Sequence, residues 1–292
     1  MAITAAQVKE LRETTGAGMM ECKKALTETN GEMQAAIDFL RTKGQAKADK
    51  KAGRTAAEGM VVISMSEDAK HAAIVEINCE TDFVAREAQF IEFSQQVADA
   101  ALANKTSDVD ALKQVKLDGG KTVEERRKEL VLKIGENIQI RRITCKDTDG
   151  AIGSYTHGGR IGVLVEMPTG DMEVAKDVAM HVAASSPMVV KPEDVAQDII
   201  AKEKEIFRAQ AAESGKPPEI VEKMVSGRVK KFLNEVALHG QPFVKDPNQT
   251  IEQMLKSKNA EVASFARFEV GEGIEKEVSN FAEEVQAQVR GE

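Results

Sequence analysis

The chain has 292 residues, of which 42% are hydrophobic and 30% charged, a composition typical of a soluble globular protein with room for two or more domains. Its 48 acidic and 40 basic residues give a net charge of −8, which argues against nucleic acid as the main partner. Three widely spaced cysteines, no secretory or transit signal and no apolar run near ~20 residues favour a bacterial cytoplasmic protein without membrane association.

The first 44 residues predict a three-helix module. Thr4-Ala5-Ala6-Gln7 is typical of a capping box that opens a helix, and Gly16-Ala17-Gly18 ends that helix. A short helix follows through Leu26, and Asn30-Gly31 turns the chain into a third helix. Residues 45–59 are rich in Ala, Lys and Gly without an apolar stripe, so we expect a linker or a mobile helix there.

Two similar units are expected next, each a β-hairpin followed by a helix. The first unit covers residues 60–142, and the second covers 143–190 and 241–273. The strands are expected at Met60–Met65, Ala72–Ile77, Ile138–Thr144, Ile152–Tyr155, Ile161–Met167 and Ser264–Val270, and the helices at Ala88–Leu102 and Glu173–Ala184. This repetition predicts an α+β fold with duplicated core subdomains.

An inserted pair of helices over residues 191–240 interrupts the second unit. Pro192–Ser214 and Pro218–Leu238 carry apolar residues at helical spacing, and each begins with Pro, a favoured helix start. The pair predicts an antiparallel coiled-coil arm roughly 33 Å long. Because two helices bury little by themselves, we expect one face to meet an accessory partner or a second copy of the chain.

The chain is expected to end in a helical module over residues 274–292. Its apolar stripe consists of Ile274, Val278, Phe281, Val285 and Val289.

The stretch from Glu76 to Arg86 predicts a corner between a strand and a helix. Thr81 or Asp82 is a natural N-cap, which places Phe83 in the first turn of the helix that follows. The chain has ten Phe, one Tyr and no Trp, so a large ring at a corner is an unusual use of a scarce residue. Two alternatives remain open: the ring packs back on the helix as a staple, which is the commoner arrangement, or it is held out for a partner's pocket.

Signals for catalysis are weak. Gly119-Gly120-Lys121-Thr122 imitates the end of a phosphate-binding loop, but Val115 stands where that motif needs Gly. The histidines are isolated and metal-ligand spacings are missing, so neither a metal nor a cofactor is expected. Glu80 and Asp82 are close enough for acid–base work, although a helix cap is the commoner use of such an Asp. We therefore predict neither a catalytic residue nor direct nucleotide binding.

Two segments carry a resemblance to a known family. Glu-Ile-Asn-Cys-Glu-Thr-Asp-Phe-Val-Ala-Arg at 76–86 resembles the signature of bacterial elongation factor Ts, and the segment from Leu11 to Leu26 is similar to that family's N-terminal signature. Weaker similarity occurs at 133–138, 157–164 and 267–273. The stretch 103–127 does not fit the family pattern.

The resemblance implies an exchange factor that binds elongation factor Tu in its GDP form and promotes GDP release, without being an enzyme. It also implies a ubiquitin-associated-like fold for the N-terminal module. Phe83 would insert near the partner's Mg²⁺ and nucleotide site. The implied contacts are Thr81, Asp82, Phe83, Val84, Ile134 and Gly135 with the partner's G domain, Arg12, Met19, Met20 and Lys23 with a G-domain helix, and His157, Val244 and Lys245 with its third domain.

Alternatives to these implied roles stay open. Met20 or Leu11 would be core residues if the N-terminal module buries them, because Met more often fills a core than a binding surface. At the level of function, the rivals are an interaction scaffold without exchange activity and a hydrolase that uses Glu80 and Asp82.

Overall fold

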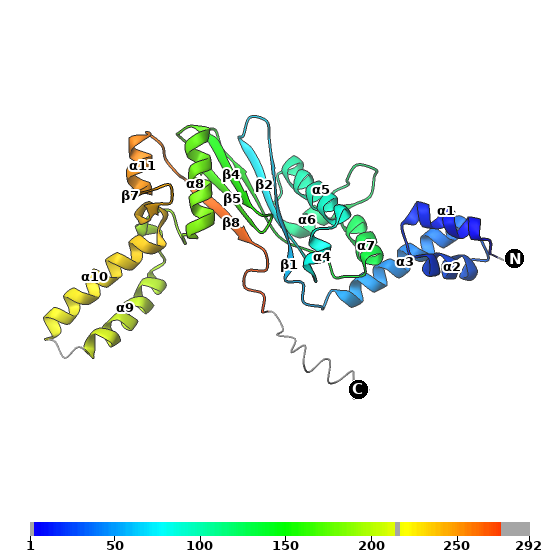
Figure 1. Ribbon diagram of the computed structural model, residues 1–292, viewed down its shortest axis with the longest axis horizontal. Coiled ribbons are helices and arrows are strands. Elements are labelled where there is room, and N and C mark those ends of the chain that lie inside the picture. Colours follow the sequence, from blue (N-terminus) through cyan, green and yellow to red (C-terminus); the bar gives the residue numbers. More distant parts are fainter. Residues whose placement is uncertain (1–2, 214–216, 276–292) are drawn as a thin grey trace.

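The computed structural model describes residues 3–213 and 217–275. The molecule is elongated, with a three-helix module at one end, a two-helix arm at the other and two β-sheets between them (Figure 1). Helix and sheet are mixed, as expected for an α+β protein. The stripe residues Val278, Phe281, Val285 and Val289 of the expected C-terminal helix lie outside the described residues.

The N-terminal module consists of α1 (Ala5–Thr15), α2 (Met19–Glu28) and the beginning of α3 (Met33–Lys51). The capping box at the start of α1 is present, with the Thr4 side chain accepting from the Gln7 N–H and the Gln7 side chain accepting from the Thr4 N–H. Gly16 ends α1 in the left-handed conformation, with φ of 68°. The core of the module is formed by Val8, Leu11, Ala17, Cys22, Ala25, Leu26, Ala36 and Leu40.

Helix α3 extends into the segment 45–59, for which a linker or a mobile helix was expected. It continues without a break to Lys51, so residues 45–51 are helical and form a strut between the N-terminal module and the first sheet unit. Ala48 is only 1% exposed and belongs to the core of the first sheet unit. Gly44 lies so close to α7 (Val123–Ile134) that an added Cβ would stand 3.1 Å from the Leu132 side chain. The small residues that made this segment look like a linker are what permits this close packing.

The two central sheets have the same topology. The first contains β1 (Glu58–Met65), β2 (His71–Cys79) and β3 (Gln139–Asp147), and the second contains β4 (Ala151–His157), β5 (Ile161–Met167) and β8 (Ser264–Glu269). Each is antiparallel, with the second strand of the hairpin at its centre. The expected strands are therefore confirmed, including the third strand that each unit receives from later in the chain.

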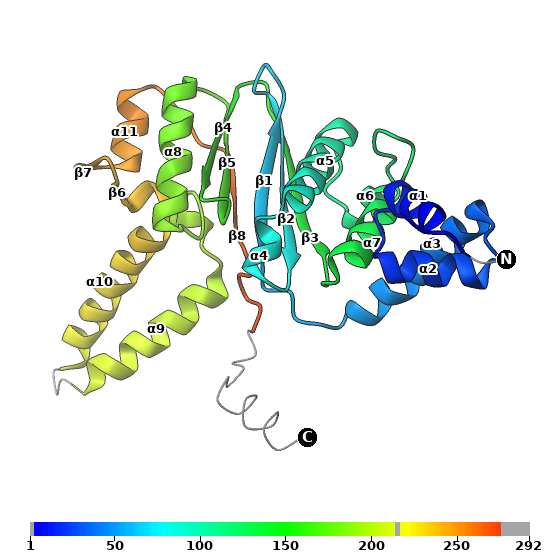
Figure 2. The same ribbon diagram turned by 45° about the vertical axis from the view of Figure 1, so that its right-hand side comes forward.

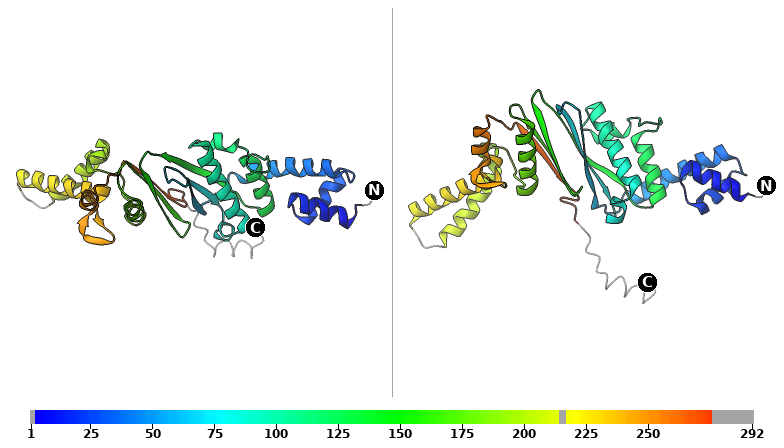
Figure 3. Two further views of the ribbon diagram at one scale, coloured as in Figure 1. Left: turned by 90° about the horizontal axis from the view of Figure 1, so that it is seen from above. Right: turned by 45° about the horizontal axis from the view of Figure 1, so that its top comes forward.

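The sheets pack face to face and carry helices on their outer faces (Figures 2 and 3). The apolar layer between them consists of Val61, Ala72, Ile74, Ile152, Leu164, Phe268 and Val270. Gly162 of β5 permits this contact, because a Cβ there would come within 2.4 Å of the Val61 side chain. The outer helices are α5 (Ala88–Asn104), α6 (Val109–Lys113) and α7 (Val123–Ile134) on the first sheet and α8 (Met172–Ser185) on the second.

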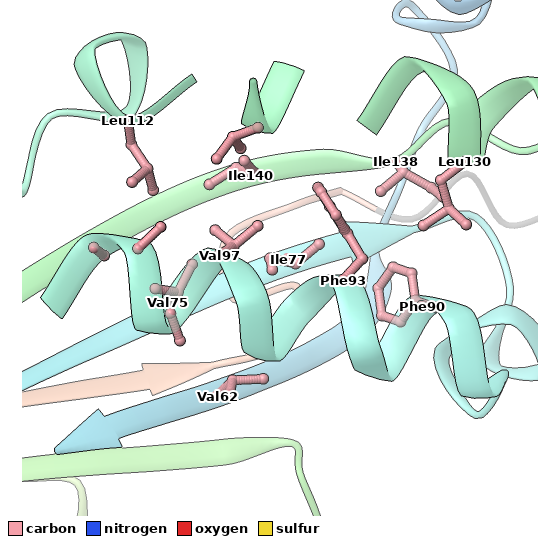
Figure 4. Close-up of a cluster of buried hydrophobic side chains, with 14 of the residues drawn as sticks. Val62, Val75, Ile77, Phe90, Phe93, Val97, Leu112, Leu130, Ile138 and Ile140 are labelled. Carbon is pink, nitrogen blue, oxygen red and sulfur yellow. The ribbon is translucent and has the colours of Figure 1, made fainter. Parts of the chain in front are cut away.

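Helices α6 and α7 were not predicted, because the stretch 103–127 is polar. They nevertheless contribute to the core, where Phe90, Phe93 and Val97 of α5 lie between the sheet and α7 (Figure 4). Leu112 of α6 and Leu130 of α7 complete this cluster from above the sheet. One apolar residue per turn is enough to pack a helix on a core when its remaining faces meet solvent.

The arm contains η1 (Pro192–Asp194), α9 (Gln197–Ala212) and α10 (Pro218–Val236). Pro218 begins α10 as expected, whereas Pro192 begins only a 3₁₀ turn and α9 starts five residues later. At the base of the arm lie η2 (Leu238–Gly240), the hairpin β6 (Pro242–Phe243) and β7 (Asp246–Thr250), and α11 (Ile251–Ser257), of which none was predicted. Within the described residues, every helix is too short or too polar to cross a membrane.

Candidate functional site

The corner after β2 folds as a short helix of its own. Thr81 caps α4 (Asp82–Ala85), and its hydroxyl oxygen accepts from the Val84 N–H at 3.4 Å. The chain then extends at Glu87, with φ of −69° and ψ of 135°, before α5 begins. The expectation of one continuous helix was therefore wrong, and Phe83 lies in a four-residue helix that precedes α5.

Phe83 is held out into solvent. Its exposed fraction is 80%, whereas Val84, the next residue, is buried in the core of the first sheet unit. A ring packed back on the helix would be largely covered, so the staple alternative was wrong. An exposed aromatic ring on an anchored corner is typical of a surface that meets another protein.

Carboxylates surround the corner, but they serve different partners. Glu80 accepts from the backbone N–H of Asn137 at 2.6 Å and pairs with Arg54 at 3.4 Å. Asp82 instead pairs with Arg86, one turn along the chain, at 2.9 Å. The two carboxylates thus stabilise local structure separately, and the geometry gives no support to a hydrolytic pair.

Cys79 lies beneath the same corner, and its Sγ–H donates to the carbonyl oxygen of Thr81 at 3.1 Å. Burial, together with the nearby carboxylates of Glu136 and Glu58, raises the pKa of this thiol to about 12. The thiol is therefore protonated at neutral pH and is not a nucleophile.

Ile134 and Gly135 lie at the end of α7, beside the corner. Gly135 ends α7 with φ of 87°, a conformation that glycine adopts without strain. Glu136 follows directly and hydrogen-bonds to the backbone of Glu80 and Thr81. The structure therefore brings the 134–135 turn and the 81–84 corner together.

The expected contact residues of the N-terminal module lie on its surface. Met19 and Met20 begin α2 and are 61% and 75% exposed, and Arg12 and Lys23 are exposed as well. Met20 is therefore no core residue, whereas Leu11 is fully buried. Two adjacent methionines in solvent form an adaptable apolar surface.

Comparison of the sequence with known proteins gives matches over its whole length. A sequence model described as Elongation factor TS matches residues 80–272. The protein called Elongation factor Ts in Thioalkalivibrio sulfidiphilus is 58% identical over 293 residues, which cover all of both chains. The protein of the same name in Methylococcus capsulatus is 60% identical over 291 residues, and that in Legionella pneumophila strain Paris is 58% identical over 288 residues. Each alignment covers 99% of this chain and 99% of the relative. The chain belongs to the Elongation factor Ts family.

The match to the Elongation factor Ts family model includes the corner, the 134–135 turn and the expected contacts His157, Val244 and Lys245. Its residues 80–272 contain α4, α7, the arm and both sheets except β1 and β2. The N-terminal module lies before the matched range and is covered by the full-length relatives.

His157, Val244 and Lys245 are held by different elements. His157 is exposed at the end of β4, where its Nδ1 lies 3.3 Å from the Tyr155 hydroxyl. Val244 is 41% exposed in the β6–β7 turn, and its N–H donates to the buried His181. Lys245 pairs with Asp177 of α8. The turn that follows His157 is fixed on β1 by an ion pair between Arg160 and Glu58. His157 is thus held by the first sheet, whereas Val244 and Lys245 are held by α8.

The segment that imitates a phosphate-binding loop has a structural use. Thr122 and Glu125 form the capping box of α7, and Lys121 pairs with Glu129 at 2.6 Å. Over the described parts of the chain, no three His, Cys, Asp or Glu side chains gather closely enough to hold a metal ion.

Sequence reasoning missed the residues that support the corner. Glu136 and Asn137 lie 55 and 57 positions from their partners in the corner, and Lys51 lies 84 positions from Gly135, so these contacts leave no local pattern. The available signal was the family-like stretch 133–138, which contains two of them.

Proposed function

We propose that this chain is a guanine-nucleotide exchange factor for elongation factor Tu and has no catalytic site of its own. The observation that carries the proposal is the exposed Phe83 ring on a corner that is fixed by hydrogen bonds, in a chain of the Elongation factor Ts family. A protein that acts in this way needs a binding surface instead of reactive groups. The proposal places the chain in the cytoplasm, where its partner works.

The proposed mechanism is differential binding. The factor binds nucleotide-free elongation factor Tu more tightly than the GDP form, and by thermodynamic linkage GDP then weakens the factor's hold by the same ratio. A thousandfold ratio corresponds to about 4 kcal/mol. Burial of the Phe83 ring in the partner would supply about 1.5–3 kcal/mol. The remainder would come from disturbance of the partner's Mg²⁺ site, beside which Asp82 would lie.

Three groups of residues form the proposed interface. Thr81, Asp82, Phe83, Val84, Ile134 and Gly135 contact the G domain near its Mg²⁺ and nucleotide site. Arg12, Met19, Met20 and Lys23 contact a G-domain helix. His157, Val244 and Lys245 contact the third domain of the partner. The exposure of Phe83, Met19, Met20 and Val244 supports these assignments, because each is a large apolar side chain left in solvent.

The test is the rate at which fluorescent GDP leaves elongation factor Tu with and without this protein. We expect strong acceleration by the wild-type chain and loss of most of it with Phe83→Ala. Ile220→Ala is the matched control, because it removes an exposed apolar side chain from the arm and should change nothing. A scaffold without exchange activity would give equal rates for wild type and Phe83→Ala, and a hydrolase would show turnover without the partner.

A further inference from the structure

The segment Gly135–Asn137 connects three parts of the molecule that are far apart in sequence. It directly follows α7, it touches the end of α3, and it touches the corner that carries Phe83. Within these three residues, one carbonyl, one carboxylate and one amide side chain each make a contact to a different segment.

Glu136 holds the backbone of the corner. Its Oε2 accepts from two successive backbone N–H groups, those of Glu80 at 3.1 Å and Thr81 at 3.0 Å. Its Oε1 accepts from the Thr81 hydroxyl at 2.7 Å. Hydrogen bonds to an ionised carboxylate are stronger than neutral ones, and two N–H groups on one oxygen fix the direction of both peptide planes.

The Thr81 hydroxyl connects this anchor to the helix that carries Phe83. While its hydrogen goes to Glu136, its oxygen accepts from the Val84 N–H and caps α4. A helix of four residues has almost no stability by itself, because helix nucleation is unfavourable. The orientation of Phe83 therefore depends on contacts from outside α4.

Asn137 and Lys51 extend the anchor to the N-terminal module. The buried Asn137 donates from its backbone N–H to Glu80, and from its side chain to the carbonyl oxygen of Arg54 at 2.8 Å. Lys51, the last residue of α3, donates to the carbonyl oxygen of Gly135. The end of the α3 strut and the Phe83 corner are thus tied to the same three residues.

We propose that Glu136 is a positioning residue that holds Phe83 ready for binding and, with Asn137 and Lys51, fixes the corner relative to the N-terminal module. The inference deepens the proposed exchange function and rests on it. A corner that is ordered only part of the time binds with an apparent affinity reduced by that fraction. Loss of Glu136 should therefore weaken binding and leave the complex, once formed, intact.

Hydrogen–deuterium exchange of the peptide containing residues 80–86 tests the structural half without any partner. Glu136→Ala should speed exchange of this peptide by about tenfold, the size expected when charge-assisted hydrogen bonds are lost. Glu136→Gln keeps an oxygen for the two N–H groups and should restore most of the protection. Glu67→Ala, which removes an exposed carboxylate at the opposite end of the β1–β2 hairpin, should change nothing.

The dependence of GDP release on factor concentration tests the other half. Glu136→Ala should raise the half-saturating concentration by about the same tenfold and leave the maximal rate unchanged, whereas Phe83→Ala should lower the maximal rate. Unchanged protection of residues 80–86, or a lower maximal rate with unchanged half-saturation, would overturn the inference. If Glu136→Ala does not fold, Glu136→Gln takes its place. It should then lower the protection of residues 80–86 and raise the half-saturating concentration, each by less than is expected for Glu136→Ala. If even the wild-type chain fails to accelerate release, the exchange function is wrong, and the hydrogen-exchange result still judges the anchor.

Discussion

At the scale of single residues, Phe83 differs from side chains that stabilise the fold. Phe83 contributes an exposed ring, so its loss removes little buried area. Glu76 is the opposite case, a fully buried carboxylate in the central strand of the first sheet. The two residues belong to the same family-like segment, yet their substitution should affect different measurements.

Phe83→Ala should change the free energy of unfolding by no more than about 0.5 kcal/mol, because substitutions at exposed positions without special contacts have small effects. Urea denaturation followed by far-UV circular dichroism checks this value. A loss of several kcal/mol would mean that the ring packs against the protein in solution.

Glu76 is surrounded by donors. Its carboxylate pairs with Arg141 at 3.0 Å and Arg142 at 2.5 Å and accepts from the Gly271 N–H at 2.8 Å. Burial alone would raise the pKa of Glu76, but the hydrogen bonds from Gly271, Asn78 and Arg142 outweigh it and hold the pKa below its ordinary value.

Glu76→Ala should therefore lower the free energy of unfolding by roughly 3–5 kcal/mol at pH 7, because it leaves two arginines without their buried partner. A carboxyl whose pKa is depressed by folding stabilises the protein above its unfolded pKa, near 4.5, and loses this contribution as pH falls through the folded value. The difference between wild type and variant should shrink in denaturation curves below pH 4.5. A constant difference from pH 7 to pH 3 would contradict this assignment.

At the scale of elements, α3 joins the N-terminal module to the core as a strut. Arg41 pairs with Glu125 of α7, Gly44 packs on Leu132, and Lys51 reaches the end of α7. The segment 45–51 thus fixes how far the N-terminal contact surface stands from Phe83.

Ala46→Pro tests whether α3 is a strut. Ala46 is exposed, so Pro there removes a backbone donor at a cost of about 3 kcal/mol without touching the core. We expect the affinity for elongation factor Tu, measured by calorimetry, to fall at least tenfold, while Ala46→Ser stays near wild type. Equal affinities for both variants would show that the segment acts as a flexible linker.

The arm is the second element with a separate role. Replacing Gln197–Val236 by a short Gly/Ser connector should leave both sheets folded, since β5 and β8 lie outside it. The replacement must stop before Leu238, which is buried in the core of the second unit. Exchange should largely survive, and association with a second copy or an accessory partner should be lost in sedimentation or pull-down measurements. Loss of exchange in the folded variant would contradict the proposed interface.

Local patterns in the sequence predicted the strands, the arm and the corner, because each depends on neighbouring residues. They failed where distant residues decide the outcome. The sequence left a linker and a helix open for 45–51, and the choice depends on contacts with α7; the break between α4 and α5 accompanies the anchoring of Thr81 by Glu136. The polar stretch 103–127 forms two helices because a few apolar residues, such as Leu112, complete a core supplied mainly by α5.

At the scale of the whole molecule, the proposed contact surfaces are distributed along an elongated body (Figure 1). Affinity then depends on several separate contacts, each of which raises the effective concentration of the next. The loss of one end should weaken binding severely without destroying the rest.

Deletion of residues 1–44 tests this distribution. The core should remain folded, because its sheets and outer helices lie beyond the cut, although exposure of Leu132 should lower its thermal stability by a few degrees. Affinity for elongation factor Tu should fall by two orders of magnitude or more. Full affinity of a folded truncated protein in calorimetry would contradict the roles of Arg12, Met19, Met20 and Lys23.

The base of the arm has a consequence for the evolution of this architecture. The chain enters and leaves the arm side by side, since Val189 and Ala237 form a parallel bridge and the Met188 N–H donates to the Val236 carbonyl. If α9 and α10 gained or lost the same number of helical turns, these contacts at the base of the arm would therefore stay unchanged. Among homologues, we therefore expect the length of the arm to vary more than the sheets and the Phe83 corner.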